Sequence, residues 1–131
     1  MTDSTFQIEL AVRDYECDMQ GVVNNSVYQN YLEHARHEYL KSKGLDFAQL
    51  TTEGIIVVVV RAELDYLRSL RSGDRFHVSV STYRASRLRL GFRQEITHSV
   101  SGQVLVRANI LTTAVNERGR PWLPESLLVL L

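Results

Sequence analysis

Cysteine is almost absent from this sequence, since Cys17 is the only one among its 131 residues. A lone cysteine cannot close a disulfide within the chain, which excludes disulfide-stapled folds and fits a reducing compartment. The neighbouring Asp18 would raise the pKa of the Cys17 thiol, and no cation stands beside it in the sequence. We therefore expect Cys17 to be a small packing residue and not a nucleophile.

The chain also has no excess of charge of either sign, because 15 Lys and Arg residues balance 15 Asp and Glu residues. Nonspecific nucleic-acid binding normally needs a strong basic excess, so this balance argues against a nucleic-acid partner. Lysine is scarce, with only Lys41 and Lys43 beside the arginines. Arginine is well suited to phosphate and carboxylate, so local anion sites stay open, although surface ion pairs explain the same composition.

Long hydrophobic runs are missing as well. The longest, from Ile55 to Val60, has six residues and stops at Arg61, far below the roughly 20 residues that span a bilayer. Residues 1–5 are neither basic nor apolar, so they do not resemble a signal peptide. We expect a cytoplasmic protein without a membrane span.

Two periods of hydrophobic residues follow one another near the start of the chain. Between residues 6 and 13 apolar and polar residues alternate, which predicts a half-buried strand. Later the apolar residues recur at helical spacing, which predicts a helix from Ser26 to about Lys43, ended by Gly44. The residues that give this spacing are Tyr28, Tyr31, Leu32, Ala35 and Tyr39.

The rest of the sequence has the pattern of a sheet. Segments 76–83, 88–96 and 104–115 alternate, and turn-forming residues separate them. Segment 54–67 begins with consecutive apolar residues, so we expect this strand to be covered on both faces. Together with the first strand, these segments predict a single α+β domain over residues 1–131, with five antiparallel strands and one long helix.

One helix covers only one face of a five-stranded sheet, so the apolar strand and the apolar tail at residues 121–131 need a further partner. An open sheet edge is also a liability, because its unpaired N–H and C=O groups can bind another strand. A homodimer that joins two sheets edge to edge resolves both problems. We therefore expect a homodimer or a homotetramer, and the sequence does not decide between them.

A carboxylate in a glycine-containing loop shortly before the helix is the most informative feature of the chain. Asp18 and Gly21 lie in this loop, and the helix begins near Asn25. A helix start presents unpaired N–H groups and the positive end of the helix dipole, which can polarise a carbonyl oxygen. A nearby carboxylate can attack the carbonyl carbon or activate water. This pairing predicts acyl transfer.

These segments resemble the hotdog-fold acyl-CoA thioesterases of the 4-hydroxybenzoyl-CoA thioesterase type. The resemblance is carried by residues 12–18, 21–28 and 30–36, and by the turn at residues 70–74. It is strongest to the plant acyl-lipid thioesterases and their small bacterial relatives, which also read D-x-x-G-V-V-N-N-x-V-Y. The dihydroxynaphthoyl-CoA thioesterases are further relatives. The resemblance implies that the five-stranded sheet wraps the central helix and that two sheets join in a dimer.

The resemblance also implies a thioester hydrolase that splits acyl-CoA or acyl-carrier-protein thioesters without a metal or another cofactor. Asp18 then falls on the catalytic carboxylate, as nucleophile or general base, and an amide near Asn25 polarises the carbonyl. Gly21 keeps the loop compact for substrate approach, and Asn24 orients the loop or binds the substrate. The simpler reading is that Asp18 and the asparagines cap a turn or the helix.

Further residues are predicted to bind the substrate. We expect Tyr28, Tyr31 and Val59 to line a hydrophobic acyl tunnel between helix and sheet, although core packing explains them more simply. Arg87 and Arg89 are predicted to bind the phosphates of coenzyme A. A solvated strand face that meets acidic residues across the dimer explains these two arginines equally well.

Other acids and histidines near the helix are expected to play lesser parts. Asp14 and Glu16 are expected to be solvated. Glu33 could act as a second base, but it more simply pairs with Arg36 or Lys41 on the polar side of the helix. The helix histidines lack a second set of ligands, so no metal site is expected.

Two rival functions stay open at this point. A hotdog hydratase or dehydratase normally needs a positioned histidine, and none lies in the loop around Asp18. A non-catalytic acyl-binding or assembly protein would use Asp18 only for structure.

Overall fold

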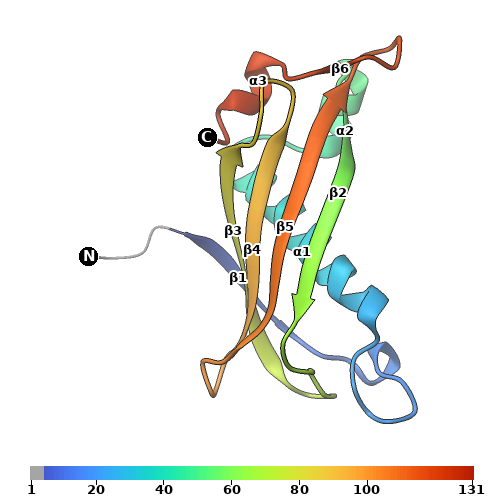
Figure 1. The fold of residues 1–131 in the computed structure, drawn as a ribbon, viewed down its shortest axis with the longest axis vertical. Coiled ribbons are helices and arrows are strands. Elements are labelled where there is room, and N and C mark those ends of the chain that lie inside the picture. The colour runs from blue at the N-terminus through green and yellow to red at the C-terminus, as the bar shows by residue number, and fades with distance from the viewer. Residues whose placement is uncertain (1–4) are drawn as a thin grey trace.

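The computed structural model describes residues 5–131, in which one antiparallel sheet lies against one long helix (Figure 1). In chain order the elements are β1 (Phe6–Ala11), the 3-10 turn η1 (Asp14–Glu16), α1 (Asn25–Ser42), α2 (Phe47–Thr52), β2 (Ile56–Tyr66), β3 (Arg75–Arg84), β4 (Leu90–His98), β5 (Val104–Val115), β6 (Pro121–Trp122) and α3 (Glu125–Leu128). The strand order is β1-β3-β4-β5-β2, and the short β6 pairs with β5. The predicted hotdog architecture is confirmed, with β6 as an addition.

The inward face of the sheet forms the core with α1. Alternate residues of β3 such as Phe76 and Val78 are buried, and Val78 pairs across β4 with Ile96. From the helix side, Leu32 is fully buried against this face. All five residues that defined the helical spacing are buried, as the pattern predicted.

The apolar strand β2 differs from the prediction, because it lies at the open edge of the sheet and is not covered on both faces. It pairs only with β5 among the described strands. The exposed fractions of Ile56, Val59 and Val60 are 42%, 51% and 42%. α1 packs over β1 and β3, and the short α2 contacts β2, but no strand within residues 5–131 pairs with the outer edge of β2.

The C-terminal tail folds back onto its own chain. Leu127 and Leu130 are buried, and the Leu130 carbonyl accepts hydrogen bonds from the hydroxyls of Tyr39 and Thr82. The tail therefore closes over the C-terminal end of α1 and the end of β3, and it leaves the β2 edge open.

A buried polar pair fixes the middle of α1 to the central strand. The Arg36 guanidinium donates to Gln94 Oε1 at 3.0 Å, and Gln94 Nε2 donates to the Leu32 carbonyl at 3.0 Å. Arg36 is only 8% exposed, so its predicted place on the polar side of the helix was wrong. Burial lowers the pKa of Arg36. Among residues 5–131 its guanidinium has no other hydrogen-bond acceptor.

Gln94→Leu is expected to lower the free energy of unfolding by about 2–4 kcal/mol, because Arg36 then stays buried without its acceptor. The double variant with Arg36→Met removes both polar groups and should recover part of the loss. Urea denaturation of the wild-type protein, the two single variants Gln94→Leu and Arg36→Met, and the double variant measures the effect. A double variant as unstable as the sum of the two single variants would contradict this account.

Candidate active site

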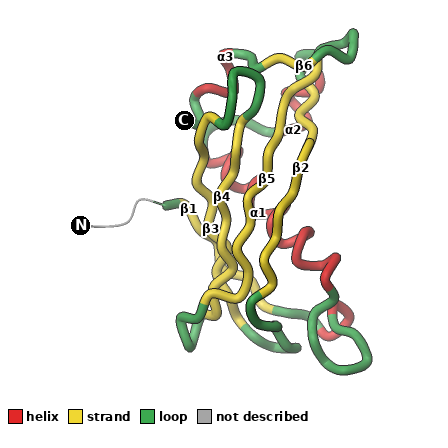
Figure 2. Tube along the Cα trace, in the orientation of Figure 1, coloured by secondary structure: helices red, strands yellow, loops and turns green. Residues whose placement is uncertain are grey.

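The loop before α1 is a tight hairpin. Cys17 and Val23 form an antiparallel bridge, and the Asp18 N–H donates to the Val22 carbonyl at 2.9 Å. Gly21 donates to the Asp18 carbonyl at 3.0 Å and has a φ of +81°, which an L side chain rarely adopts. Figure 2 shows this loop beside the N-terminal end of α1. The hairpin thus holds Asp18 at the start of the helix.

The Asp18 carboxylate has one oxygen engaged and one oxygen open. Oδ1 accepts from the N–H groups of Gln20 at 2.8 Å and Val22 at 3.3 Å. Oδ2 has no hydrogen-bond partner within residues 5–131, and the side chain is exposed. Asp18 therefore caps its own turn, as the simpler reading predicted, and still presents an oxygen to a ligand.

The N-terminus of α1 has no side-chain cap. Asn24 occupies the N-cap position, but its side chain makes no capping hydrogen bond. In the part of the chain that the structure describes, the amide N–H groups of Asn25 and Ser26 meet no protein acceptor. All three residues are exposed. The positive end of the helix dipole is therefore open to a ligand.

Glu16 is buried, so the expectation that it is solvated was wrong. Its residue exposure is 9%, and its Oε1 accepts from the Tyr31 hydroxyl at 2.7 Å and the Arg13 N–H at 2.9 Å. Burial and the bond to Glu16 raise the pKa of Tyr31, which keeps the phenol protonated. The 3-10 turn rotates Glu16 inward, and a strand pattern could not predict that rotation. The one sequence signal for a role of Glu16 at the site was its position two residues before Asp18.

The three residues predicted to line an acyl tunnel lie in different surroundings, since the two tyrosines are buried and Val59 is exposed. Tyr28 and Tyr31 are 2% and 5% exposed. The Tyr28 hydroxyl accepts from the Leu70 N–H at 2.8 Å. Val59 lies on the exposed β2 edge, away from both tyrosine hydroxyls in the fold.

Arg87 and Arg89 lie at the opposite end of the sheet from Asp18. The hairpin contacts Arg71, just before β3 begins, through the bridge from Val22. Both arginines follow the end of β3 (Figure 1), and a ten-residue strand is roughly 30 Å long. One chain therefore does not bring them to the site of Asp18.

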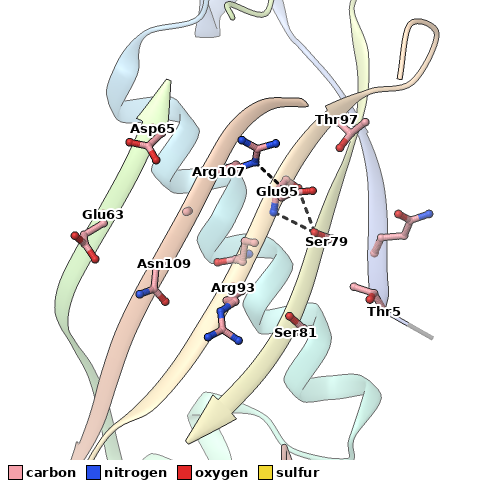
Figure 3. A pocket seen from close by; sticks show the side chains of 13 residues that line it. Thr5, Glu63, Asp65, Ser79, Ser81, Arg93, Glu95, Thr97, Arg107 and Asn109 are labelled. Carbon is pink, nitrogen blue, oxygen red and sulfur yellow. Dashed lines mark hydrogen bonds and ion pairs between the residues drawn. The ribbon is translucent and has the colours of Figure 1, made fainter. Parts of the chain in front are cut away.

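A hollow of about 720 Å³ lies on the outer face of the sheet, with α1 on the other side (Figure 3). Its charges are largely satisfied by their neighbours. Arg107 bonds Glu95 at 3.1 Å, and the Arg93 guanidinium lies 3.8 Å from the centroid of the Tyr83 ring. The hollow holds no nucleophile beside a base, and we assign it no catalytic part.

A serine, a histidine and an acid also meet beside β1. Ser99 Oγ donates to Glu9 at 3.0 Å and lies 3.2 Å from His77 Nδ1. In a catalytic triad the acid accepts a hydrogen bond from the imidazole, whereas here Glu9 accepts hydrogen bonds from Ser99 and Arg75. The hydrogen bond from Arg75 lowers the pKa of Glu9. Because Glu9 does not orient the histidine, this arrangement does not activate the serine as a nucleophile.

The helix brings no second acid–base group to the hairpin. Glu33 is exposed and lies two turns into α1, about 12 Å from its start. Lys41 pairs with Glu38 at 3.3 Å, and within residues 5–131 Glu33 forms no ion pair, although its charge acts on Arg36 and His37. His37 packs on Phe47 with ring centroids 4.5 Å apart, and burial lowers its pKa.

Neither a metal cluster nor a reactive thiol accompanies Asp18. Across residues 5–131 no group of three or more His, Cys, Asp or Glu residues could hold a metal ion. Burial, together with the charges of Asp14 and Asp18, raises the pKa of Cys17, as the sequence predicted. None of the helices in this part of the chain is long and apolar enough to cross a membrane.

Known proteins resemble this chain in sequence and in fold. Residues 12–130 match the thioesterase-like superfamily. The chloroplastic acyl-acyl carrier protein thioesterase ATL3 of Arabidopsis thaliana is 35% identical over 115 residues. That match covers 88% of this chain, and the chain spans 60% of the length of the plant protein.

Two solved structures superpose on almost the whole chain. A 1,4-dihydroxy-2-naphthoyl-CoA thioesterase from Synechocystis has a TM-score of 0.87 and 26% identity, with 95% of this chain and 93% of that chain covered. A hypothetical protein from Aquifex aeolicus has a TM-score of 0.89 and 30% identity, with 96% and 99% covered.

Proposed function

This chain belongs to the thioesterase-like superfamily, and from that membership we propose that it hydrolyses acyl thioesters to a free acid and a thiol. The observation that carries this proposal is the open oxygen of Asp18 beside an uncapped helix N-terminus. The two groups supply the two parts that thioester hydrolysis needs, which are a nucleophile or base and donors for the developing oxyanion.

In the proposed reaction the thioester carbonyl oxygen faces the amides at Asn25 and Ser26. Asp18 then follows one of two routes. As a nucleophile it adds to the carbonyl carbon, the C–S bond breaks with release of the thiolate, and water hydrolyses the mixed anhydride. As a general base it takes a proton from water, whose oxygen adds to the carbonyl carbon. The C–S bond then breaks, and Asp18 passes its proton to the departing thiolate. Both routes return Asp18 to its carboxylate form.

The proposed substrates are thioesters of coenzyme A or of acyl carrier protein. The names of relatives include both carriers, with an acyl-acyl carrier protein thioesterase in the plant and a 1,4-dihydroxy-2-naphthoyl-CoA thioesterase in Synechocystis. The test is release of free thiol, followed with a chromogenic disulfide reagent, across aliphatic and aromatic acyl-CoA and acyl-carrier-protein substrates. Turnover of any of them supports the proposal. A folded protein that turns over none of them would favour the acyl-binding alternative.

We propose that the active unit is a homodimer joined through the β2 edge. This edge is unpaired within residues 5–131 and exposes several apolar side chains. Its Tyr66 end contacts the site, because the Tyr66 ring lies 5.6 Å from that of Tyr28 and its hydroxyl is 3.5 Å from the Asn25 carbonyl. Antiparallel pairing of two β2 strands places the Ile56 end of the partner beside this Tyr66 end. The acyl group would then lie between the two copies, with Val59 of the partner subunit near it.

The same antiparallel pairing reverses the partner's sheet end for end. The partner's β3–β4 connection then lies at the same end of the joined sheet as Asp18. Arg87 and Arg89 could therefore serve the site of the other copy, although they are distant from Asp18 in their own chain.

Replacing Arg87 and Arg89 together by alanine is expected to raise the KM for acyl-CoA about tenfold with little change in kcat, because phosphate contacts act equally before and during the reaction. Acyl-pantetheine substrates, which lack the nucleotide phosphates, serve as the control and should show no change. Steady-state kinetics on both substrates measure this. An equal effect on both would contradict a phosphate-binding role.

A further inference from the structure

Residue 16 connects the chain before the hairpin with the second turn of α1. The Glu16 side chain is 10% exposed, and its carboxyl group bonds both the Arg13 N–H and the Tyr31 hydroxyl. The Arg13 guanidinium lies 3.7 Å away and is itself largely exposed. The short bond from the Tyr31 hydroxyl, at 2.7 Å, therefore joins this segment to the helix through a buried hydrogen bond.

The backbone of the same residue holds the other strand of the hairpin. The Glu16 carbonyl accepts a hydrogen bond of 3.2 Å from the N–H of Asn24, the N-cap residue of α1. Glu16 therefore fixes both strands at the base of the hairpin that carries Asp18. One turn earlier on α1, the Tyr28 hydroxyl supports the opposite flank through Leu70.

A buried carboxyl group is a costly way to fill space, because an apolar side chain of similar volume is often as stable or more stable. The energetic cost of burying Glu16 is explained if its hydrogen bond with Tyr31 fixes the position of the Asp18 hairpin relative to α1. Thioester hydrolysis needs the Asp18 oxygen and the helix amides at fixed separations, and a shift of about 1 Å can cost about a hundredfold in rate. Glu16 lies two residues before Asp18 and directly bonds the residue before those amides.

We propose that Glu16 and Tyr31 are a positioning pair that holds the Asp18 hairpin in register with the N-terminus of α1. This inference rests on the proposed thioesterase function and deepens it. Neither residue touches the reacting atoms. Tyr31 acts through Glu16, and Glu16 acts through the backbone at Asn24 and the two residues that separate it from Asp18.

The test compares four variants by kcat, KM and thermal unfolding, on the substrate that the wild-type protein turns over best. Tyr31→Phe removes one hydroxyl and keeps the ring that packs 4.7 Å from Phe76, so kcat should fall about tenfold with KM nearly unchanged. Glu16→Ala should lower kcat about a hundredfold. Glu16→Gln keeps the accepting oxygen and should restore most of the activity.

Tyr39→Phe is the matched control, because it removes an equally buried hydroxyl at the far end of α1, where the Leu130 carbonyl accepts at 3.0 Å. It should leave kcat unchanged. A folded Tyr31→Phe protein with wild-type kcat would overturn the positioning pair, and so would equal losses in Tyr31→Phe and Tyr39→Phe. Glu16→Gln as slow as Glu16→Ala would also overturn it. These results leave the proposed function standing if Asp18→Asn is inactive, whereas an inactive wild-type protein would overturn both.

Discussion

Asp18→Asn is expected to lower kcat for thioester hydrolysis by about a thousandfold or more, because a neutral amide is neither a nucleophile nor a base for this reaction. The fold should persist. The Asn side-chain oxygen can still accept the turn bonds that Asp18 Oδ1 takes from Gln20 and Val22. Substrate binding should persist as well, so the loss should fall on kcat. Single-turnover kinetics and circular dichroism of the same preparation measure both properties.

Asp14→Asn provides the matched control for this loss. Asp14 lies in the same segment and accepts a hydrogen bond from the Ser72 hydroxyl, which an asparagine oxygen can also accept. Its kcat should stay within about twofold of the wild-type value, as for a surface substitution. Thioester hydrolysis that survives Asp18→Asn in full would exclude Asp18 as the catalytic carboxylate.

Val59→Lys is expected to convert the proposed homodimer to monomers and to abolish most of the activity. Charged side chains on an edge strand prevent pairing with another strand, and each dimer would carry two of them. We expect dimer affinity to fall by a factor of about 100 or more, because two ammonium groups would be desolvated at the interface. Light scattering coupled to size exclusion measures the mass, and thiol release measures the activity of the same fractions.

Val100→Lys is the control for added charge, since Val100 is 86% exposed in the turn between β4 and β5, far from the β2 edge. It should remain dimeric and active. If Val59→Lys remained a dimer of full activity, the two copies would not meet at β2 and the site would not need the partner.

Much of the fold follows from sequence patterns because the chain keeps each period over a whole element. The helix was expected from Ser26 to about Lys43 and is observed as Asn25–Ser42. The first half of β3 and the middle of β5 alternate as their sequences do, whereas residues 112–114 of β5 are all buried. A local apolar pattern cannot say which surface covers a strand, however. β2 was predicted to be covered on both faces, and in the single chain its apolar side chains at Ile56, Val59 and Val60 are exposed. The proposed homodimer would account for this difference.

The site was only partly predictable. Asp18 lies seven residues before the first helical residue, Asn25, so a local motif could predict that both belong to one hairpin-to-helix segment. Glu16 and Arg36 are buried through contacts with Tyr31 and Gln94, which lie 15 and 58 residues away in the chain. No periodicity reports such contacts, and both residues were expected on polar surfaces. Arg87 is separated from Asp18 by the length of β3, and no short segment of sequence shows at which end of the sheet a residue lies.

The decisive measurement is a crystal structure with a non-hydrolysable acyl-CoA analogue, in which a methylene group separates the carbonyl from the sulfur. We expect the carbonyl oxygen at about 2.7–3.1 Å from the amide nitrogen of Asn25 or Ser26, with the Asp18 carboxylate beside the carbonyl carbon. We also expect a second copy, joined at β2, to enclose the acyl group. A ligand bound in the outer-face hollow, or with its carbonyl away from the start of α1, would show that Asp18 and the helix N-terminus do not form the active site.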